Sequence, residues 1–345
     1  MSPQDQRPQP PDIPPQVALL QMVTGYWVSQ AIAVATKLGI PDLLKDSPQS
    51  SQELAAATGT HEPSLYRLLR VLASVGVFTE GRERRFELTP LSACLESDVP
   101  GSLRAFTLLM GEPWLWSSWM ALLHSITTGQ AASEHVHGMG QFDYFAQHPQ
   151  AAAIFDQAMT NLATQWHAAA LTAYDFSRAR TVVDIGGGHG ALLTAILTAH
   201  PQLRGVLFDQ PYVVEGAKPR LTAAGLIQRC ELVGGNFFDA VPAGGDLYLL
   251  GHILIDWDEA RATTILHNIR QAIAPEGKVL ILEEVIPQGP GPSWEKLLDL
   301  NMLVVLGGGG RTESEFRSLL GQAGFELSQI IPTGSPIRLI EGIYR

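Results

Sequence analysis

The residues best suited to chemistry are an acidic side chain and the glycines that follow it. Asp184 lies near the end of the apolar run Thr181–Ile185, and three consecutive glycines come next: Gly186, Gly187 and Gly188. This order predicts a buried strand, a tight turn and then a helix. Because glycine permits sharp turns and close approach to main-chain N–H groups, the turn is predicted to hold a ligand.

Polar side chains also follow the next two apolar runs. Asp209 comes about twenty residues beyond the glycines, where a carboxylate accepts hydrogen bonds from both hydroxyls of a ribose. Asn236 and Phe237 follow the third run, and an amide beside an aromatic ring suits adenine. The sequence therefore predicts a cofactor that contains a nucleoside.

Two cofactors fit a nucleoside site of this kind. A dinucleotide fold requires the glycine spacing GxGxxG, whereas the glycines here stand at 186, 188 and 190, with Ala191 at the third required position. A cofactor that ends in an amino acid needs only a short glycine turn and polar partners for its ammonium and carboxylate. The spacing favours S-adenosylmethionine.

Strands and helices alternate after residue 177, and helices separate the first five strands. This pattern predicts an α/β fold with a doubly wound, parallel, Rossmann-like sheet, closed by an antiparallel pair. We expect residues 177–345 to form the catalytic domain. The expected strands are 181–185, 205–208, 230–234, 246–250, 278–283, 327–331 and 337–344.

Three further segments precede this domain. Residues 1–16 contain a proline-rich stretch that is typical of a disordered tail. Residues 17–100 predict a helix, two shorter helices and a hairpin, which is a winged-helix-like arrangement. Residues 1–100 contain eight Lys and Arg against eleven Asp and Glu, so we expect dimerisation of this segment rather than DNA binding. Residues 101–176 are expected to be a helical linker or lid that lines the substrate pocket.

Composition excludes several classes of function. The net charge of −11 argues against a nucleic-acid partner. The two cysteines, Cys94 and Cys230, form no CxxC motif, the histidines lack metal-ligand spacing, and no metal site is expected. The sequence also shows no signal peptide and no membrane-length apolar run, so we expect a cytoplasmic protein without a membrane partner.

The chain from about residue 17 to residue 344 resembles S-adenosylmethionine-dependent O-methyltransferases of the plant caffeate and acetylserotonin type, in their bacterial secondary-metabolism branch. The stretches that carry the resemblance are 183–188, 208–211, 234–238, 256–257, 282–283 and 299–303. The resemblance implies a homodimer that methylates a small metabolite, with O-methylation as the default.

The resemblance also assigns roles by position. Residues implied in cofactor binding are Asp184, Gly186, Gly187, Gly188, Asp209, Asn236, Phe237, Gly251 and Trp257. Residues expected to line the acceptor site are Met159, Trp166, Ile255, Asn301 and Met302. The family usually has Asp where Asn236 stands, and an amide can still hydrogen-bond an amino group.

Three further positions depart from the family pattern. Ile255 stands where the family has the histidine that takes the proton from the substrate hydroxyl. Gly310 replaces a glutamate that orients this histidine, and Gly251 replaces a common cationic residue. Glu283 matches the other orienting carboxylate. His252 is a candidate substitute base, because it would share a helix face with Ile255 if this stretch were helical.

The missing base leaves the acceptor chemistry open. A phenol titrates near 10, so its ionisation at pH 7 costs about 4 kcal/mol, and general-base catalysis is worth about 10²- to 10⁴-fold. A carboxylate, an acidic phenol, an amine or an enol carbon would tolerate the loss. C- or N-methylation and a non-methylating hydroxylase, decarboxylase or pericyclase-like activity are therefore alternatives. A ligand-sensing winged-helix regulator is a remote one.

Overall fold

The computed structural model describes residues 13–344, except for the side chains of Thr164 and Gln165. Most of the predicted tail over residues 1–16 lies outside the described residues. The chain divides into two compact units, the first ending at Glu112 and the second beginning at Pro113.

Unit 1 contains the predicted succession of helices and a hairpin. Ser50 caps α4 together with Glu53, and Gly59 ends this helix in the left-handed conformation, as its type allows. The small sheet has the order β1-β3-β2. The elements are α1 (Pro15–Val23), α2 (Gly25–Lys37), α3 (Ile40–Leu44), β1 (Gln49–Ser50), α4 (Ser51–Thr58), α5 (Glu62–Ser74), β2 (Phe78–Glu80), η1 (Arg82–Arg84), β3 (Arg85–Leu88), α6 (Pro90–Ala93) and α7 (Arg104–Met110).

The first predicted helix is two helices in the structure. The break falls at Thr24, whose hydroxyl donates to the carbonyl of Leu20 over 2.8 Å, and Gly25 follows with low helix propensity. Among the described helices, none is long and apolar enough by itself to span a membrane; α1 and α2 reach those criteria only as a bent pair. The apolar side chains of α1 are largely exposed, and the helix has no buried residue.

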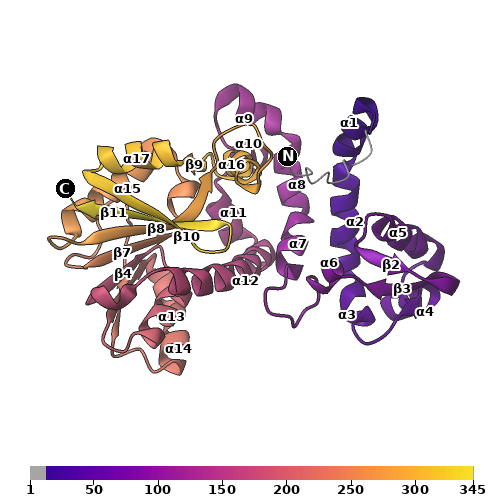
Figure 1. Cartoon of the computed structure of the whole chain (residues 1–345), viewed down its shortest axis with the longest axis horizontal. Coiled ribbons are helices and arrows are strands. Elements are labelled where there is room, and N and C mark those ends of the chain that lie inside the picture. Colours follow the sequence, from indigo (N-terminus) through magenta and orange to yellow (C-terminus); the bar gives the residue numbers. More distant parts are fainter. Residues whose placement is uncertain (1–12, 345) are drawn as a thin grey trace, which may run out of the picture. The chain divides into compact units, whose positions relative to one another are not determined.

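Unit 2 begins with short helices that lead into one long helix. Figure 1 shows α12 leading into the sheet region of this unit. The helices are α8 (Pro113–Met120), α9 (Leu122–Thr128), α10 (Ala132–His137), α11 (Gln141–Gln147) and α12 (Pro149–Ala173). Their aromatic residues pack with one another, with Trp114 5.3 Å from Phe145 and Phe145 4.8 Å from Phe155, measured between ring centroids. Much of the predicted aromatic lid is therefore a packed core.

The remainder of unit 2 is the predicted doubly wound sheet. Its elements are η2 (Phe176–Arg178), β4 (Thr181–Ile185), α13 (Ala191–Ala199), β5 (Arg204–Asp209), α14 (Pro211–Ala223), β6 (Cys230–Gly234), β7 (Leu247–Gly251), η3 (Leu254–Asp256), α15 (Glu259–Ala272), β8 (Lys278–Ile286), α16 (Trp294–Val305), β9 (Arg311–Thr312), α17 (Glu313–Gln322), β10 (Phe325–Pro332) and β11 (Ile337–Tyr344).

The sheet order places a ligand site at one edge. The order is β10-β11-β8-β7-β4-β5-β6, with β11 antiparallel to β8 and the strands from β8 to β6 parallel. The order reverses direction at β4, between β5 on one side and β7 on the other. Open parallel sheets bind ligands beyond the carboxyl ends of their strands at such a reversal.

Alternating strand residues pack into two separate cores. Val182 and Leu207 face one core, which α13 and α14 cover, while Val183 and Phe208 face another, which α15 and α17 cover (Figure 1). This alternation is the two-residue period of a strand buried on both faces. The resulting rigid sheet fixes the positions of the loops at its carboxyl edge.

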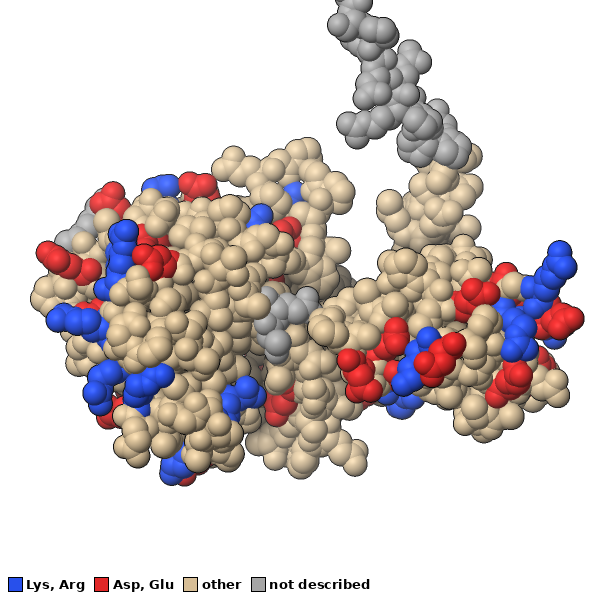
Figure 2. Space-filling view, turned by 60° about the horizontal axis from the view of Figure 1, so that its bottom comes forward, with Lys and Arg blue, Asp and Glu red and all other residues tan. Residues whose placement is uncertain are grey.

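Charge is mixed on the visible surface. Figure 2 shows Lys and Arg interspersed with Asp and Glu on that face, without a continuous basic area. Together with the net charge of −11, this distribution gives a nucleic-acid backbone no extended partner on that face.

Candidate functional site

The turn after β4 forms a narrow glycine cradle. The backbone of Gly186 has a φ of 67°, and its N–H donates to the carbonyl of Phe208 over 2.8 Å. A Cβ at Gly186 would lie 2.5 Å from Cδ1 of Ile253, and one at Gly187 would lie 2.5 Å from Oδ2 of Asp184. No atom lies within 4 Å of a Cβ built on Gly188. The turn therefore requires glycine at its base and is open at Gly188.

Two carboxylates support this cradle. Asp209 accepts the N–H of Gly188 on Oδ2 and the N–H of Gln210 on Oδ1, over 2.8 and 2.7 Å. Asp184 is 2 % exposed, and its Oδ2 has no hydrogen-bond partner among the described residues. Burial, with the nearby charge of Asp209, raises the pKa of Asp184 to about 7, and burial also raises the pKa of Asp209.

An aromatic group follows β6 and η3. Phe237 lies 4.8 Å from Phe238 and 6.0 Å from Trp257 between ring centroids, and Phe238 lies 4.9 Å from Trp257. Asn236 accepts the N–H of Phe238 on Oδ1, and Asn268 holds the carbonyls of both phenylalanines. These bonds hold a cluster of edge-to-face aromatic rings beside the glycine cradle.

The loop after β7 corrects one expectation from sequence. His252 has a φ of 54°, and only the single turn η3, from Leu254, is helical. His252 and Ile255 therefore do not share a helix face. A Cβ on the neighbouring Gly251 would meet nothing within 4 Å, so this position opens into free space.

Ile255 and Glu283 are buried together without a proton acceptor on residue 255. The backbone N–H of Ile255 donates to Oε1 of Glu283 over 3.0 Å, and Oε2 of Glu283 has no partner in the described structure. Burial raises the pKa of Glu283, and it raises that of neighbouring Asp256 to about 7. This unpaired oxygen therefore belongs to Glu283, which matches a carboxylate that orients the base in the O-methyltransferases that the sequence resembles.

The glycine run 307–310 holds the same loop from behind. The N–H of Gly309 donates to the carbonyl of Ile255 over 2.9 Å, and a Cβ on Gly308 would collide with that carbonyl. Arg311, which is buried, donates to the carbonyls of Leu254 and Trp257 over 2.8 and 3.0 Å. A Cβ on Gly310, the position of the family's glutamate, would lie 3.1 Å from Cδ1 of Ile286.

The structure pairs His252 with Glu284, a contact that the sequence did not predict. Nε2 of His252 lies 3.2 Å from Oε2 of Glu284, and the imidazole stacks on Trp166 with ring centroids 4.2 Å apart. Two consecutive glutamates at the end of β8 were the available signal, but the strand order that brings β7 beside β8 decides the contact.

The predicted acceptor residues occupy two helices. Met159 and Trp166 lie on α12, while Asn301 and Met302 lie half-buried on α16. The indole N–H of Trp119 donates to Oδ1 of Asn301 over 3.0 Å, which links α8 to α16. Of these residues, Trp166 lies at the end of β7, because its ring stacks on His252.

The arrangement fits S-adenosylmethionine by its own features. The open face of Gly188, the carboxylate of Asp209 and the aromatic surface at Phe237 provide partners for an amino-acid end, a ribose and an adenine. Gly251 provides free space without a charge. No group of three or more His, Cys, Asp or Glu in the described part of the chain is arranged to hold a metal ion.

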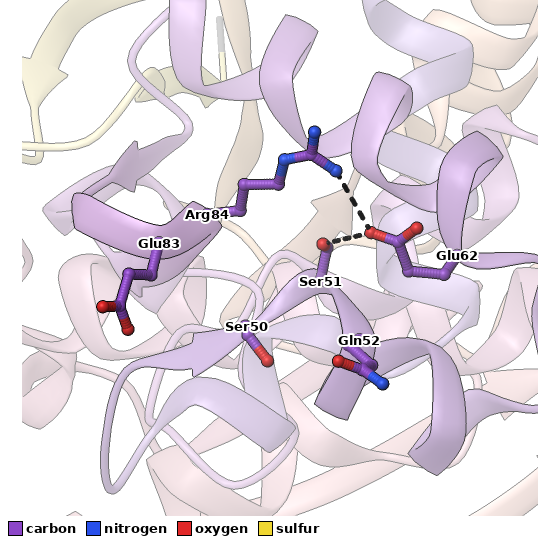
Figure 3. A pocket seen from close by; sticks show the side chains of 6 residues that line it. All are labelled: Ser50, Ser51, Gln52, Glu62, Glu83 and Arg84. Atoms are coloured by element: carbon purple, nitrogen blue, oxygen red, sulfur yellow. Dashed lines mark hydrogen bonds and ion pairs between the residues drawn. The ribbon is translucent and has the colours of Figure 1, made fainter.

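A separate hollow lies in unit 1. It has a volume of about 370 Å³ and is lined by Ser50, Ser51, Gln52, Glu62, Glu83 and Arg84. Figure 3 shows Glu62 between Ser51, at 2.6 Å, and Arg84, at 3.7 Å. All lining residues belong to unit 1, so this hollow shares no residue with the cradle.

The fold and the cradle define an S-adenosylmethionine-dependent methyltransferase. Residues 119–326 match the O-methyltransferase domain, and residues 20–98 match the O-methyltransferase dimerisation domain. The chain belongs to this O-methyltransferase family, uses S-adenosylmethionine, acts on a small molecule and forms a homodimer.

Three similar proteins span nearly the whole chain. The phenazine O-methyltransferase PhzM of Lysobacter antibioticus is 47% identical over 329 residues, which cover 95% of this chain and 96% of that protein. The 8-amino-8-demethylriboflavin N,N-dimethyltransferase of Streptomyces davaonensis is 38% identical over 342 residues, covering 97% and 98%. The structure of human N-acetylserotonin methyltransferase with S-adenosylmethionine matches with a TM-score of 0.85 at 27% identity, covering 97% and 99%.

Proposed function

We propose that this enzyme O-methylates an aromatic hydroxyl on a small, flat, largely apolar metabolite, and that it does so without a base at residue 255. The observation that carries the proposal is the buried, aliphatic Ile255 beside the orphaned Oε2 of Glu283. The name of the Lysobacter relative, a phenazine O-methyltransferase at 47% identity, supports a hydroxyl on a planar ring system.

The proposed residue roles follow the geometry at the carboxyl edge. Asp209 holds the ribose, Phe237 and Trp257 cover the adenine, and the cradle at Gly186–Gly188 receives the amino-acid end, with Asn236, Asp184 and Gly251 around them. Ile255 and Trp166 face the acceptor, and Met159, Asn301 and Met302 complete its pocket. Each of these roles is tested by the cofactor affinity or the acceptor KM of the corresponding alanine variant.

Catalysis rests chiefly on placement. S-adenosylmethionine supplies an electrophilic methyl group on a sulfonium. The packed loop 254–257, held by Arg311 and the glycine run, fixes the floor of the site. Alignment of reacting groups is worth several kcal/mol, so a rigid floor compensates for part of the missing base.

A graded panel of acceptors tests this proposal. Single-ring and fused-ring phenols whose pKa values span about 6 to 10 are incubated with the enzyme and labelled S-adenosylmethionine, and products are identified by mass spectrometry and NMR. We expect O-methylated products, with faster turnover for the more acidic hydroxyls. Cofactor binding without any O-methylated product from the whole panel would reject the proposal.

N-methylation is the second candidate, because an amine is nucleophilic without losing a proton first. Ile255 stands where the family has its base, and Gly310 stands where it has one of the two carboxylates that orient this base. One relative is named as an N,N-dimethyltransferase. An aminophenol acceptor separates the two, since NMR of the product shows which atom carries the methyl group. C-methylation is read from the same spectra. Turnover without S-adenosylhomocysteine would instead indicate a non-methylating reaction.

We also propose that the enzyme is cytoplasmic. Cys94 and Cys230 are both free thiols in the structure, which suits a reducing compartment. Fractionation of the producing cells, followed by immunodetection, tests this location.

A further inference from the structure

The imidazole of His252 is held in one tautomer by its partners. A carboxylate can only accept a hydrogen bond, so Nε2 of His252 must carry the proton that it donates to Glu284 over 3.2 Å. In the neutral ring, Nδ1 is then left with a free lone pair, and no described residue donates to it. An imidazole arranged in this way is ready to accept a proton.

The backbone at His252 is held in an unfavourable conformation. Its φ of 54° lies in the left-handed region, which non-glycine residues seldom adopt. The N–H of His252 donates to the carbonyl of Leu282 over 3.1 Å, and Trp166 stacks on the ring at an interplanar angle of 26°. The side chain is 24% exposed, whereas that of Glu284 is 4% exposed, so the imidazole remains reachable.

The titratable groups that face this imidazole come from three neighbouring elements, β8, η3 and α12. Burial lowers the pKa of His252, but the hydrogen bond and charge of Glu284, with the charges of Glu283 and Asp256, outweigh it and raise the pKa above its usual value. His167, on α12, has a pKa lowered to about 4, first by burial and then by His252. His167 is therefore neutral near pH 7 and does not supply a competing charge.

We propose that His252 is the proton acceptor of this enzyme, and that Glu284 is the positioning residue that fixes its tautomer. The inference rests on the proposed O-methylation. The O–H bond of the acceptor breaks, its proton goes to Nδ1 of His252, and the electron pair forms the O–CH₃ bond as the S–CH₃ bond breaks. Glu284 stabilises the resulting imidazolium, which releases its proton to solvent after product leaves.

The kinetic test uses His252→Asn, because asparagine tolerates the left-handed conformation and its amide can still donate to Glu284. With a weakly acidic phenol, we expect kcat/KM to fall by about 10²- to 10⁴-fold, and with an acceptor already ionised at pH 7 to fall far less. The wild-type kcat/KM rises with pH through the raised pKa of His252, and this step is absent in the variant. His267→Asn, at an exposed histidine on α15, is the matched control and retains wild-type kinetics.

Glu284→Gln tests the positioning role separately. The amide cannot stabilise an imidazolium as a carboxylate does, so the pH step shifts to lower pH while cofactor affinity stays unchanged. An unchanged pH profile in either the His252 or the Glu284 variant would overturn the proposal.

A second measurement does not depend on turnover. ¹⁵N NMR of histidine-labelled wild-type protein, with His252→Asn used for assignment, reports the tautomer and pKa of His252. We expect the Nε2–H tautomer and a pKa of His252 above the usual value for histidine. A neutral Nδ1–H tautomer would reject the inference, even if the acceptor panel yields no product. If NMR shows the Nε2–H tautomer but no acceptor is O-methylated, the proposed function is rejected, whereas the orientation of His252 by Glu284 is supported.

Discussion

Asp184→Asn should stabilise the cofactor-free protein, and increasingly so as the pH rises. Asp184 is buried, its Oδ2 has no partner among the described residues, and burial with the charge of Asp209 raises its pKa to about 7. An unfolded aspartate titrates near 3.9. The folded state therefore binds a proton more tightly than the unfolded state, so its stability falls as the pH rises between these two values.

The magnitude follows from the two pKa values. Each unit of pKa difference is worth about 1.4 kcal/mol, and the ionisation of Asp184 costs the folded state roughly 2 to 3 kcal/mol more at pH 8 than at pH 5. Asparagine preserves the shape and does not titrate. The difference in free energy of unfolding between variant and wild type should consequently grow by about this amount across that range.

Urea unfolding at pH 5, 6, 7 and 8, followed by tryptophan fluorescence at one fixed protein concentration, measures this difference. Asp143→Asn, at an exposed position on α11, is the matched control and should show a difference that is nearly independent of pH. A stability difference for Asp184→Asn that is constant with pH, or that decreases toward pH 8, would refute the account of Asp184 as a buried carboxylate that favours its neutral form.

Three further predictions concern the cofactor and the loop. Asp209→Ala removes the ribose partner and the bond to Gly188, so isothermal titration should show a Kd for S-adenosylmethionine about 10- to 100-fold higher, whereas Glu231→Ala, exposed on adjacent β6, should not. Gly251→Lys places a cation in open space beside the cradle and should lower that Kd several-fold; weaker binding would contradict a carboxylate there. Arg311→Lys loses the two-carbonyl grip on the loop and should cost about 1 to 3 kcal/mol in urea unfolding, while Arg317→Lys, in an exposed ion pair, costs little.

The catalytic fold could be predicted from the sequence because local signals agree with the global arrangement. Each parallel strand is a continuous apolar run that ends in polar residues or glycine, and helices separate the runs. That pattern alone predicts that Asp184, Asp209 and Gly251 lie at one edge of a sheet, and the strand order confirms that they do. The antiparallel closing pair was predicted in the same way and is present as β10 and β11.

The details of the acceptor side were harder to predict because they depend on contacts between distant segments. The pairing of β9 with β8 brings Arg311 beside the loop at Leu254, although 56 intervening residues separate them in sequence. The left-handed conformation of His252 has no local signal, since neither glycine nor asparagine stands there. The apolar spacing likewise predicts a single helix across Thr24, whereas in the structure the helix ends there and the threonine hydroxyl donates to the carbonyl of Leu20.

The glycine run 307–310 limits what a single substitution can restore beside residue 255. Its backbone contacts the carbonyl of Ile255 directly, and a Cβ on Gly310 would press on Ile286 at 3.1 Å. Ile255→His alone would therefore supply a base without its second orienting carboxylate, and Gly310→Glu alone would crowd Ile286 and serve no base. Neither single substitution therefore supplies both the base and its second orienting carboxylate. A change of acceptor is therefore easier to engineer through the residues around His252 than through residues 255 and 310.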